Sequence, residues 1–154
     1  MNETPSPYAS PVIIGCDHAA YGMKESIKAF LESQETPVVD AGCHGLESVH
    51  YPDFAREVAN KVASGECPRG ILLCGTGLGM SMAANRFQGV RAALVSDGFS
   101  ARMSREHNNS NVLVMGARVI GEALAQDLVK IWMETPFAGG RHQDRIDMFE
   151  AFGS

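Results

Sequence analysis

The stretch Gly70–Met80, which reads GILLCGTGLGM, decides the fold of this chain. Its apolar first half predicts a buried strand that ends at Cys74, and a glycine-rich turn follows directly and opens the next helix. The first N–H groups of such a helix have no partner within it and lie at the positive end of its dipole. The turn is therefore expected to bind an anion, and a thiol beside it should ionise more readily than a free cysteine.

The turn fits neither of two nucleotide-binding patterns, the dinucleotide fingerprint and Walker A. Gly75-Thr76-Gly77 begins like the dinucleotide fingerprint, but Met80 stands where the third glycine belongs. The Walker A pattern fails because no Gly-Lys-Ser/Thr follows the turn. An anion-binding turn without nucleotide features remains, beside the alternative of a tight strand–helix connection that only needs a flexible backbone.

Outward from this turn, short apolar runs alternate with amphipathic stretches along the chain. The predicted strands are Val12–Cys16, Pro37–Asp40, Gly70–Cys74, Arg91–Val95 and Asn111–Met115. The predicted helices are Tyr21–Ser33, Tyr51–Ala63, Leu78–Asn85, a helix capped by Ser96 or Asp97 that ends near Glu106, Val119–Glu134, and a short helix at 141–149. This alternation predicts an α/β fold, a Rossmann-like three-layer sandwich with a five-stranded parallel sheet and helices on both faces. Residues 12–150 are expected to form a single domain after a flexible N-terminal tail, residues 1–11.

Polar side chains follow several of the predicted strands. In parallel sheets the ligand sits at the carboxyl ends of the strands. Asp17 and His18 follow the first strand and the Cys74 turn follows the third, so these residues are expected to lie together. An Asp-His pair there can bind or exchange protons with a polar ligand. The alternative is that Asp17 caps the next helix while His18 is a solvated loop residue.

Two further groups of side chains lie in the second half of the chain. His107, at the end of a predicted helix, could act as an acid or base with Asn108 orienting a hydroxyl, or could only complement the helix dipole. Arg141 and Arg145 are four residues apart, a spacing that stacks two guanidinium forks on one helix face and suits a phosphate. They could equally be a solvated face, or serve a site in a neighbouring subunit. Arg118 is a third candidate cation at the end of a strand.

Composition limits the possible functions. The chain has 154 residues and a net charge of −5, which argues against nucleic acid as the main partner. Neither a signal peptide nor a membrane-length apolar run is present, so a cytoplasmic location is expected. The four cysteines form no C-x-x-C pair, and Cys16, Cys43 and Cys67 are interpreted as reduced thiols. The histidines show no metal-ligand spacing, and no metal site is expected.

Five motifs taken together resemble one family. The chain is similar to the type B ribose-5-phosphate isomerases and the galactose-6-phosphate isomerase subunits. The motifs that carry the resemblance, in the order in which they occur, are Gly15-Cys16-Asp17-His18, Tyr51-Pro52-Asp53, Cys74–Gly79, Arg105-Glu106-His107-Asn108 and Gly139-Gly140-Arg141-His142-Gln143-x-Arg145. The resemblance extends from Val12 to Phe149. It implies a metal-independent enzyme without a cofactor, whose active sites lie between the two subunits of a homodimer, with a tetramer also possible.

The resemblance also implies roles for individual residues. Cys74 would be the base that moves a proton between C1 and C2 of a sugar phosphate, with Thr76 assisting proton transfer at the substrate oxygens. The N–H groups of Gly75, Gly77 and Gly79 would stabilise the enediolate.

Ring opening and substrate binding are assigned in the same way. Asp17 and His107 resemble the residues that open the sugar ring, whereas Tyr51 and Asn108 resemble groups that orient the substrate. The phosphate-binding set, partly supplied by the second subunit, would be His18, Arg118, Arg141 and Arg145.

Three functions are compatible with this resemblance. The first is an aldose–ketose isomerase that interconverts ribose 5-phosphate and ribulose 5-phosphate. The second is an isomerase of a six-carbon sugar phosphate, such as allose or galactose 6-phosphate, with the same chemistry in a roomier pocket. The third is a non-catalytic sugar-phosphate sensor, which would have no need for a base at Cys74.

Overall fold

One parallel sheet forms the centre of the molecule in the computed structural model, which describes residues 3–153. Its strands lie in the order β2-β1-β3-β5-β4, and every hydrogen-bonded pair is parallel. The strands are β1 (Val12–Cys16), β2 (Val38–Gly42), β3 (Arg69–Cys74), β4 (Ala92–Leu94) and β5 (Val112–Gly116). The predicted α/β sandwich with a five-stranded parallel sheet is confirmed.

The helices follow the predicted order closely. They are a short 3₁₀ helix η1 (His18–Ala20), α1 (Tyr21–Ser33), α2 (Tyr51–Ala63), α3 (Leu78–Ala84), α4 (Gly98–Glu106), α5 (Glu122–Glu134) and α6 (Arg141–Glu150). Helix α5 begins at Glu122 instead of the predicted Val119, because the N–H groups of Val119 and Ile120 both donate to the carbonyl of Gly116 in a turn.

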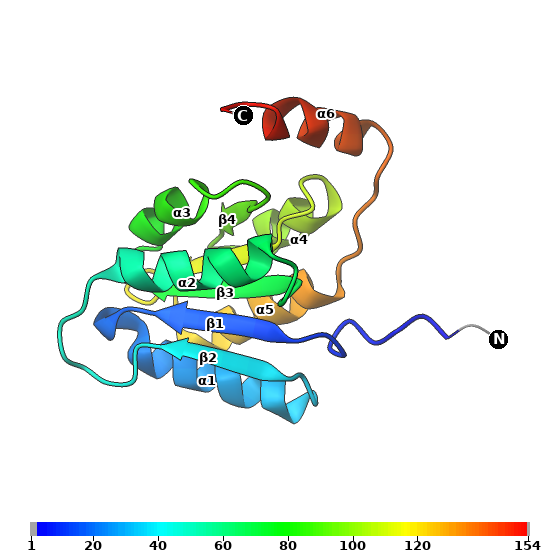
Figure 1. Cartoon of the computed structure of the whole chain (residues 1–154). Helices are drawn as coiled ribbons and strands as arrows, with labels where there is room; N and C mark the ends of the chain where they lie inside the picture. Colours follow the sequence, from blue (N-terminus) through cyan, green and yellow to red (C-terminus); the bar gives the residue numbers. More distant parts are fainter. Residues whose placement is uncertain (1–2, 154) are drawn as a thin grey trace.

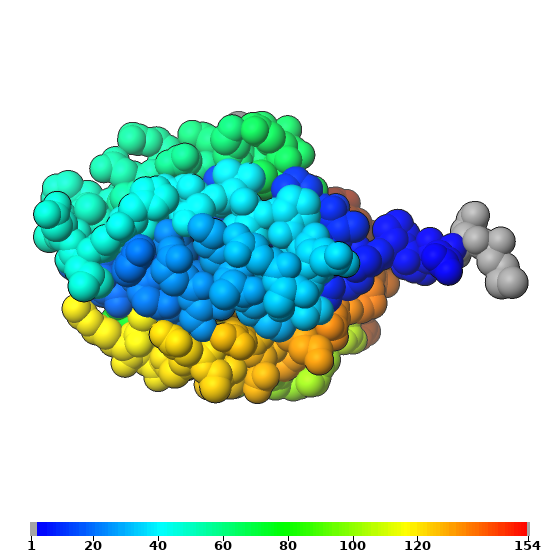
Figure 2. All heavy atoms as spheres, turned by 90° about the horizontal axis from the view of Figure 1, so that it is seen from below, coloured from blue at the N-terminus to red at the C-terminus, as the bar shows by residue number. Residues whose placement is uncertain are grey.

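The helices cover the sheet in two layers (Figure 1). Helices α1, α4 and α5 pack on one face, and α2 and α3 pack on the other. On the face that α1, α4 and α5 cover, α1 and α5 lie next to each other, as the view from below in Figure 2 shows. The central strands β1 and β5 are buried along their whole length, as parallel strands covered on both faces must be. The loops that follow β1 and β5 therefore start from well-buried strands.

Helix α6 differs from the others in its packing. It lies apart from the sheet, beyond α3 and β4 (Figure 1), and Ile146 is its one buried side chain. The Glu150 carboxylate, at its end, accepts a hydrogen bond from Nη1 of Arg91 at 2.8 Å. The position of α6 thus depends on few contacts.

Part of the N-terminal segment packs on the domain. Tyr8 is buried and its hydroxyl donates to Oε1 of Glu134 at 3.0 Å, and burial together with this carboxylate raises the pKa of Tyr8 to about 12. Of the segment 1–11, expected to be a flexible tail, Met1 and Asn2 lie outside the described residues. No helix within residues 3–153 has the length and apolarity needed to cross a membrane.

Candidate active site

Cys74 lies at the last position of β3, where the sheet gives way to the glycine-rich turn. Its side chain is 5% exposed, and the N–H of Gly77 donates to its Sγ at 3.1 Å. The Cys74 sulfur therefore lies at the glycine-rich turn, within hydrogen-bond distance of one of its N–H groups, as the sequence predicted.

Close packing explains why this turn is rich in glycine. Gly77 has φ +80°, and a Cβ on it would lie 2.4 Å from Cδ1 of Leu94. A Cβ on Gly79 would lie 2.4 Å from Cζ of Tyr51, so the Tyr51 ring lies directly against the first turn of α3. Only a backbone without side chains fits between these neighbours.

Thr76 is exposed at the tip of the turn. Its Oγ1 accepts a hydrogen bond from the N–H of Leu78 at 3.3 Å. Its backbone packs on β5 so tightly that a Cβ on Gly116 would lie 2.6 Å from the Thr76 carbonyl. The hydroxyl is therefore held at the exposed tip of the turn, two residues after Cys74.

Asp17 and His18 join this turn from β1. The N–H of Asp17 donates to the carbonyl of Leu73 at 3.1 Å, which places Asp17 beside the end of β3. Its Oδ1 caps η1 by accepting from the N–H of Ala19 at 3.0 Å, so the capping role considered for Asp17 is confirmed. Nδ1 of His18 accepts from the N–H of Val49 at 3.2 Å, so His18 is not a free loop side chain.

Arg118 reaches the same turn from beyond β5. Its N–H donates to the carbonyl of Gly75 at 2.9 Å, and its Nη1 is 3.4 Å from where a Cβ of Gly75 would lie. The Cys74 half-site, as we name this group, comprises Asp17, His18, Tyr51, Cys74–Gly79 and Arg118. It lies where β1 and β3 are neighbours and the strand order reverses, which is where ligands bind in open α/β sheets.

The other predicted residues lie at the opposite end of the sheet, where the strands begin. Helix α4 starts after the carboxyl end of β4 and runs back to the edge where β5 begins, so His107 and Asn108 are remote from Cys74. The ring of His107 stacks on that of His142 in α6, with centroids 4.2 Å apart and planes 10° apart. The N–H of Ala138 donates to the carbonyl of Glu106 at 3.0 Å. We name His107, Asn108, Arg141, His142 and Arg145 the His107 half-site.

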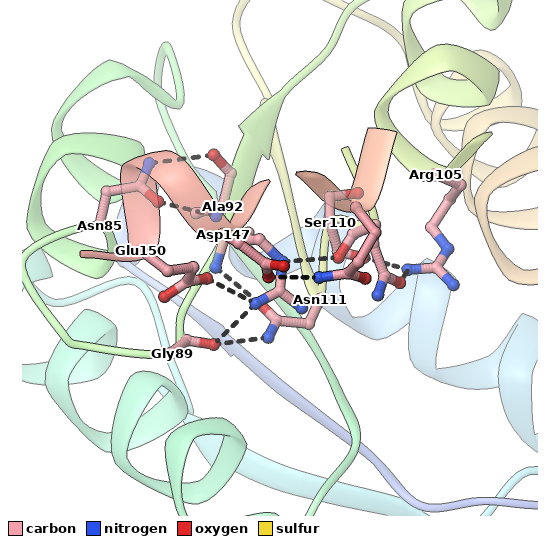
Figure 3. Close-up of polar contacts among 11 residues, drawn as sticks. Asn85, Gly89, Ala92, Arg105, Ser110, Asn111, Asp147 and Glu150 are labelled. Carbon is pink, nitrogen blue, oxygen red and sulfur yellow. Dashed lines mark hydrogen bonds and ion pairs between the residues drawn. The ribbon is translucent and has the colours of Figure 1, made fainter. Parts of the chain in front are cut away.

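Figure 3 shows the polar contacts beside this half-site. The amide of Asn111 donates to the carbonyl of Gly89 at 2.8 Å and accepts from the N–H of Arg91 at 2.7 Å, and Arg91 holds Glu150 of α6. A cavity of about 680 Å³ lies between the end of α6 and residues 85–93, with Asn108 in its wall. Of this half-site, Asn108 therefore borders the cavity, and no residue of the Cys74 turn lines it.

Arg105, which belongs to the same sequence motif as His107, has a structural place. It is buried, its Nη1 donates to Oδ1 of Asn109 at 2.9 Å, and its guanidinium lies over the ring of Trp132. Burial lowers the pKa of Arg105 to about 10. Its contacts bind the end of α4 to the core and position the residues after it.

Two pairs of side chains that lie together in the structure were not predicted from the sequence. One is the stacked pair of His107 and His142. The other is Cys16 and Cys43, whose buried sulfurs are 3.8 Å apart with both thiols free. Burial raises the pKa of Cys16, which keeps it a neutral thiol. Within the described part of the chain, no group of three His, Cys, Asp or Glu side chains could hold a metal ion.

Comparison with known proteins shows the family and the fold. Residues 12–149 match the family described as Ribose/Galactose Isomerase. The chain is 52% identical to the putative sugar phosphate isomerase YwlF of Bacillus subtilis, over 88% of this chain and 91% of that protein. It is 44% identical to ribose-5-phosphate isomerase B of Escherichia coli, over 91% of this chain and 94% of that protein. The solved structure of Clostridium thermocellum ribose-5-phosphate isomerase B has a TM-score of 0.90 at 50% identity and covers 91% of this chain and 95% of that one.

The chain belongs to the ribose/galactose isomerase family. Its fold is that of the ribose-5-phosphate isomerase B structures. The protein is an enzyme, an aldose–ketose isomerase.

Proposed function

We propose that this enzyme interconverts ribose 5-phosphate and ribulose 5-phosphate through an enediolate, with Cys74 as the base. The observation that carries the proposal is the hydrogen bond from the Gly77 N–H to Cys74 Sγ at 3.1 Å, in the glycine-rich turn that opens α3. This contact supports the proposal because proton transfer next to a carbonyl needs a base close to donors that can hold the developing negative charge.

The reaction begins with the sugar ring. Asp17 and His107 transfer protons between the ring oxygen and the C1 hydroxyl, and the open-chain aldehyde results. The Cys74 thiolate then takes the proton from C2, and the C–H electron pair forms the C1–C2 double bond while the C1 oxygen takes the negative charge. The proton of the C2 hydroxyl moves to the C1 oxygen, the thiol gives its proton to C1, and the C2 carbonyl of the ketose forms with no net gain or loss of electrons.

The enediolate needs donors for its charged oxygens. The N–H groups of Gly75 and Gly79 are suited to this role, whereas the N–H of Gly77, expected to share it, donates to Cys74 Sγ in this structure. Thr76 assists proton exchange at the enediolate oxygens. Removing one preorganised donor from such a site typically costs about 3 kcal/mol of transition-state stabilisation. Tyr51 and Asn108 orient the sugar hydroxyls.

The phosphate requires a separate anchor. His18 and Arg118 lie on the Cys74 half-site, whereas Arg141 and Arg145 lie on the His107 half-site. Binding energy from this remote group positions the reacting carbons against the thiolate.

The two half-sites belong to one reaction only if two chains meet. His107 and Cys74 lie at opposite edges of the same sheet, so one chain cannot bring them together. We therefore propose a cytoplasmic homodimer in which each active site combines the Cys74 half-site of one chain with the His107 half-site of the other. Two-fold symmetry makes both sites identical.

A six-carbon sugar phosphate is the second candidate substrate, because the family description includes galactose as well as ribose. A panel of ribose 5-phosphate, allose 6-phosphate and galactose 6-phosphate separates the candidates. We expect the highest kcat/KM with ribose 5-phosphate. A preference for a six-carbon substrate would support the alternative, and binding without turnover of any substrate would indicate a sensor.

The base is tested by Cys74→Ala. We expect kcat to fall by about a thousandfold or more, as for loss of a general base, while the calorimetric Kd for the sugar phosphate stays within about threefold. The matched control is Cys67→Ala, a buried cysteine before β3 whose loss should leave kcat unchanged. Full activity in Cys74→Ala would refute the cysteine mechanism.

A further inference from the structure

The stacked rings of His107 and His142 join two helices that are far apart in sequence. His107 follows α4, and His142 is the second residue of α6. Their centroids are 4.2 Å apart with planes at 10°, which is a parallel stack. The His107 side chain is 43% exposed, so the core does not immobilise it and its orientation depends on contacts such as this one.

The same stack lies at the start of α6. Helix α6 buries only Ile146, and its linker donates from the N–H of Ala138 to the carbonyl of Glu106 beside the stack. Arg141 precedes His142 in the chain, and Arg145 lies one helical turn after Arg141. The position of both guanidinium groups relative to His107 therefore follows from the position of the His142 ring.

Charges around the pair favour a neutral His142 ring. Partial burial and the positive charges of His107, Arg141 and Arg145 lower the pKa of His142, and Glu106 opposes this. Oε1 of Glu106 lies 4.0 Å from Nε2 of His107. A neutral ring can stack on His107 in either protonation state, whereas two stacked imidazolium ions would repel each other.

We propose that His142 is a positioning residue for isomerisation, whose ring holds His107 in place and sets its distance from Arg141 and Arg145. The inference rests on the proposed function, in which His107 acts at the ring-opening end of the sugar and the arginines bind its phosphate. The span between these groups must match the length of the substrate. His142 is then a determinant of that span.

Three variants of the full-length protein test this role. His142→Ala removes the stack, His142→Phe keeps a flat ring without its nitrogens, and Gln143→Ala is the control on the exposed neighbour in α6. In His142→Ala we expect kcat for ribose 5-phosphate to fall about tenfold, because a small misplacement of a reacting group is costly. The inhibition constant of inorganic phosphate should change by less than about threefold. His142→Phe should restore kcat to within about threefold of wild type, and Gln143→Ala should leave it unchanged.

A second measurement does not depend on turnover. The ring protons of His107 should shift in the NMR spectrum of His142→Ala, because the ring current of the neighbour is lost, and should not shift in Gln143→Ala. An unmoved His107 signal, unchanged kcat in His142→Ala, a Phe variant as impaired as the Ala variant, or weaker phosphate inhibition as the only effect would each overturn the proposal. If the wild-type protein turns over no sugar phosphate while the signal still shifts, the proposed function fails and the catalytic role of His142 fails with it, but the stack itself stands.

Discussion

At the scale of single residues, the most unusual group outside the active site is the buried ammonium of Lys24. The side chain is fully buried, and its Nζ donates to both carboxylate oxygens of Asp40 at 2.8 Å. Burial alone would raise the pKa of Asp40, but the hydrogen bonds from Lys24 and from the N–H of Gly42 lower it overall. The pair connects α1 to the edge strand β2 directly before the loop that leads to Tyr51.

We expect Lys24→Met to destabilise the protein by about 3 kcal/mol, because it leaves a largely buried carboxylate without its main partner. Since the folded-state pKa of Asp40 lies below its unfolded value of about 3.9, its stabilisation is present above that pH and is lost as the pH falls. The wild type should therefore lose stability below about pH 4 more steeply than Lys24→Met.

Urea denaturation at a series of pH values measures both effects. The control is Lys28→Met, whose ammonium is 3.3 Å from Asp40 and partly exposed, and which should cost less than about 1 kcal/mol. Equal losses in the two variants, or parallel pH profiles for wild type and Lys24→Met, would contradict this description of the pair.

Some site residues were predictable from sequence at this scale and others were not. Asp17 follows, and Cys74 ends, a short apolar run that is typical of a buried strand, and parallel topology then brings both residues to the same end of the sheet. Local patterns carry no information about contacts between distant side chains. The ring of Tyr51 against Gly79 and the stack of His142 on His107 therefore required the structure.

At the scale of elements, the predicted bounds were most accurate where both ends carried a signal. Helices α1 and α2 begin and end at the predicted residues, and Asp97 caps α4 by accepting from the N–H of Ser100 at 2.7 Å, as one of the two expected caps. The edge strand β4 is shorter than predicted, because it pairs only with β5. The placement of β5 between β3 and β4 is a long-range choice that the alternation of strands and helices leaves open.

Helix α6 is the element whose stability is most separable from that of the fold. We expect Ile146→Ala to loosen α6 alone, because Ile146 is its one buried side chain. Hydrogen–deuterium exchange should accelerate in α6 but not in α5, which buries five side chains. The kcat/KM for the sugar phosphate should fall about tenfold or more as Arg141 and Arg145 lose their place. Unchanged exchange in α6, or equal acceleration in α5, would show that α6 is part of the core.

At the scale of the whole molecule, the sheet separates the groups that the proposed reaction must combine. The Cys74 turn lies at the carboxyl ends of the strands, and His107 lies at the edge where β5 begins. The sequence could suggest a shared site only through family resemblance and the late position of the arginines. The parallel topology gives the physical reason, because α4 must return to the amino edge before the next parallel strand can start.

The most direct test of the shared active site uses two kinds of mixed dimer, each isolated by giving its two chains different affinity tags. A dimer of one Cys74→Ala chain and one His107→Asn chain has one site with both changes and one intact site, so we expect about half of the wild-type activity. A dimer of one wild-type chain and one chain carrying both substitutions has one change in each site, and should be inactive. The reverse result, with the first dimer inactive and the second about half active, would show that Cys74 and His107 act within one chain and would contradict the shared active site.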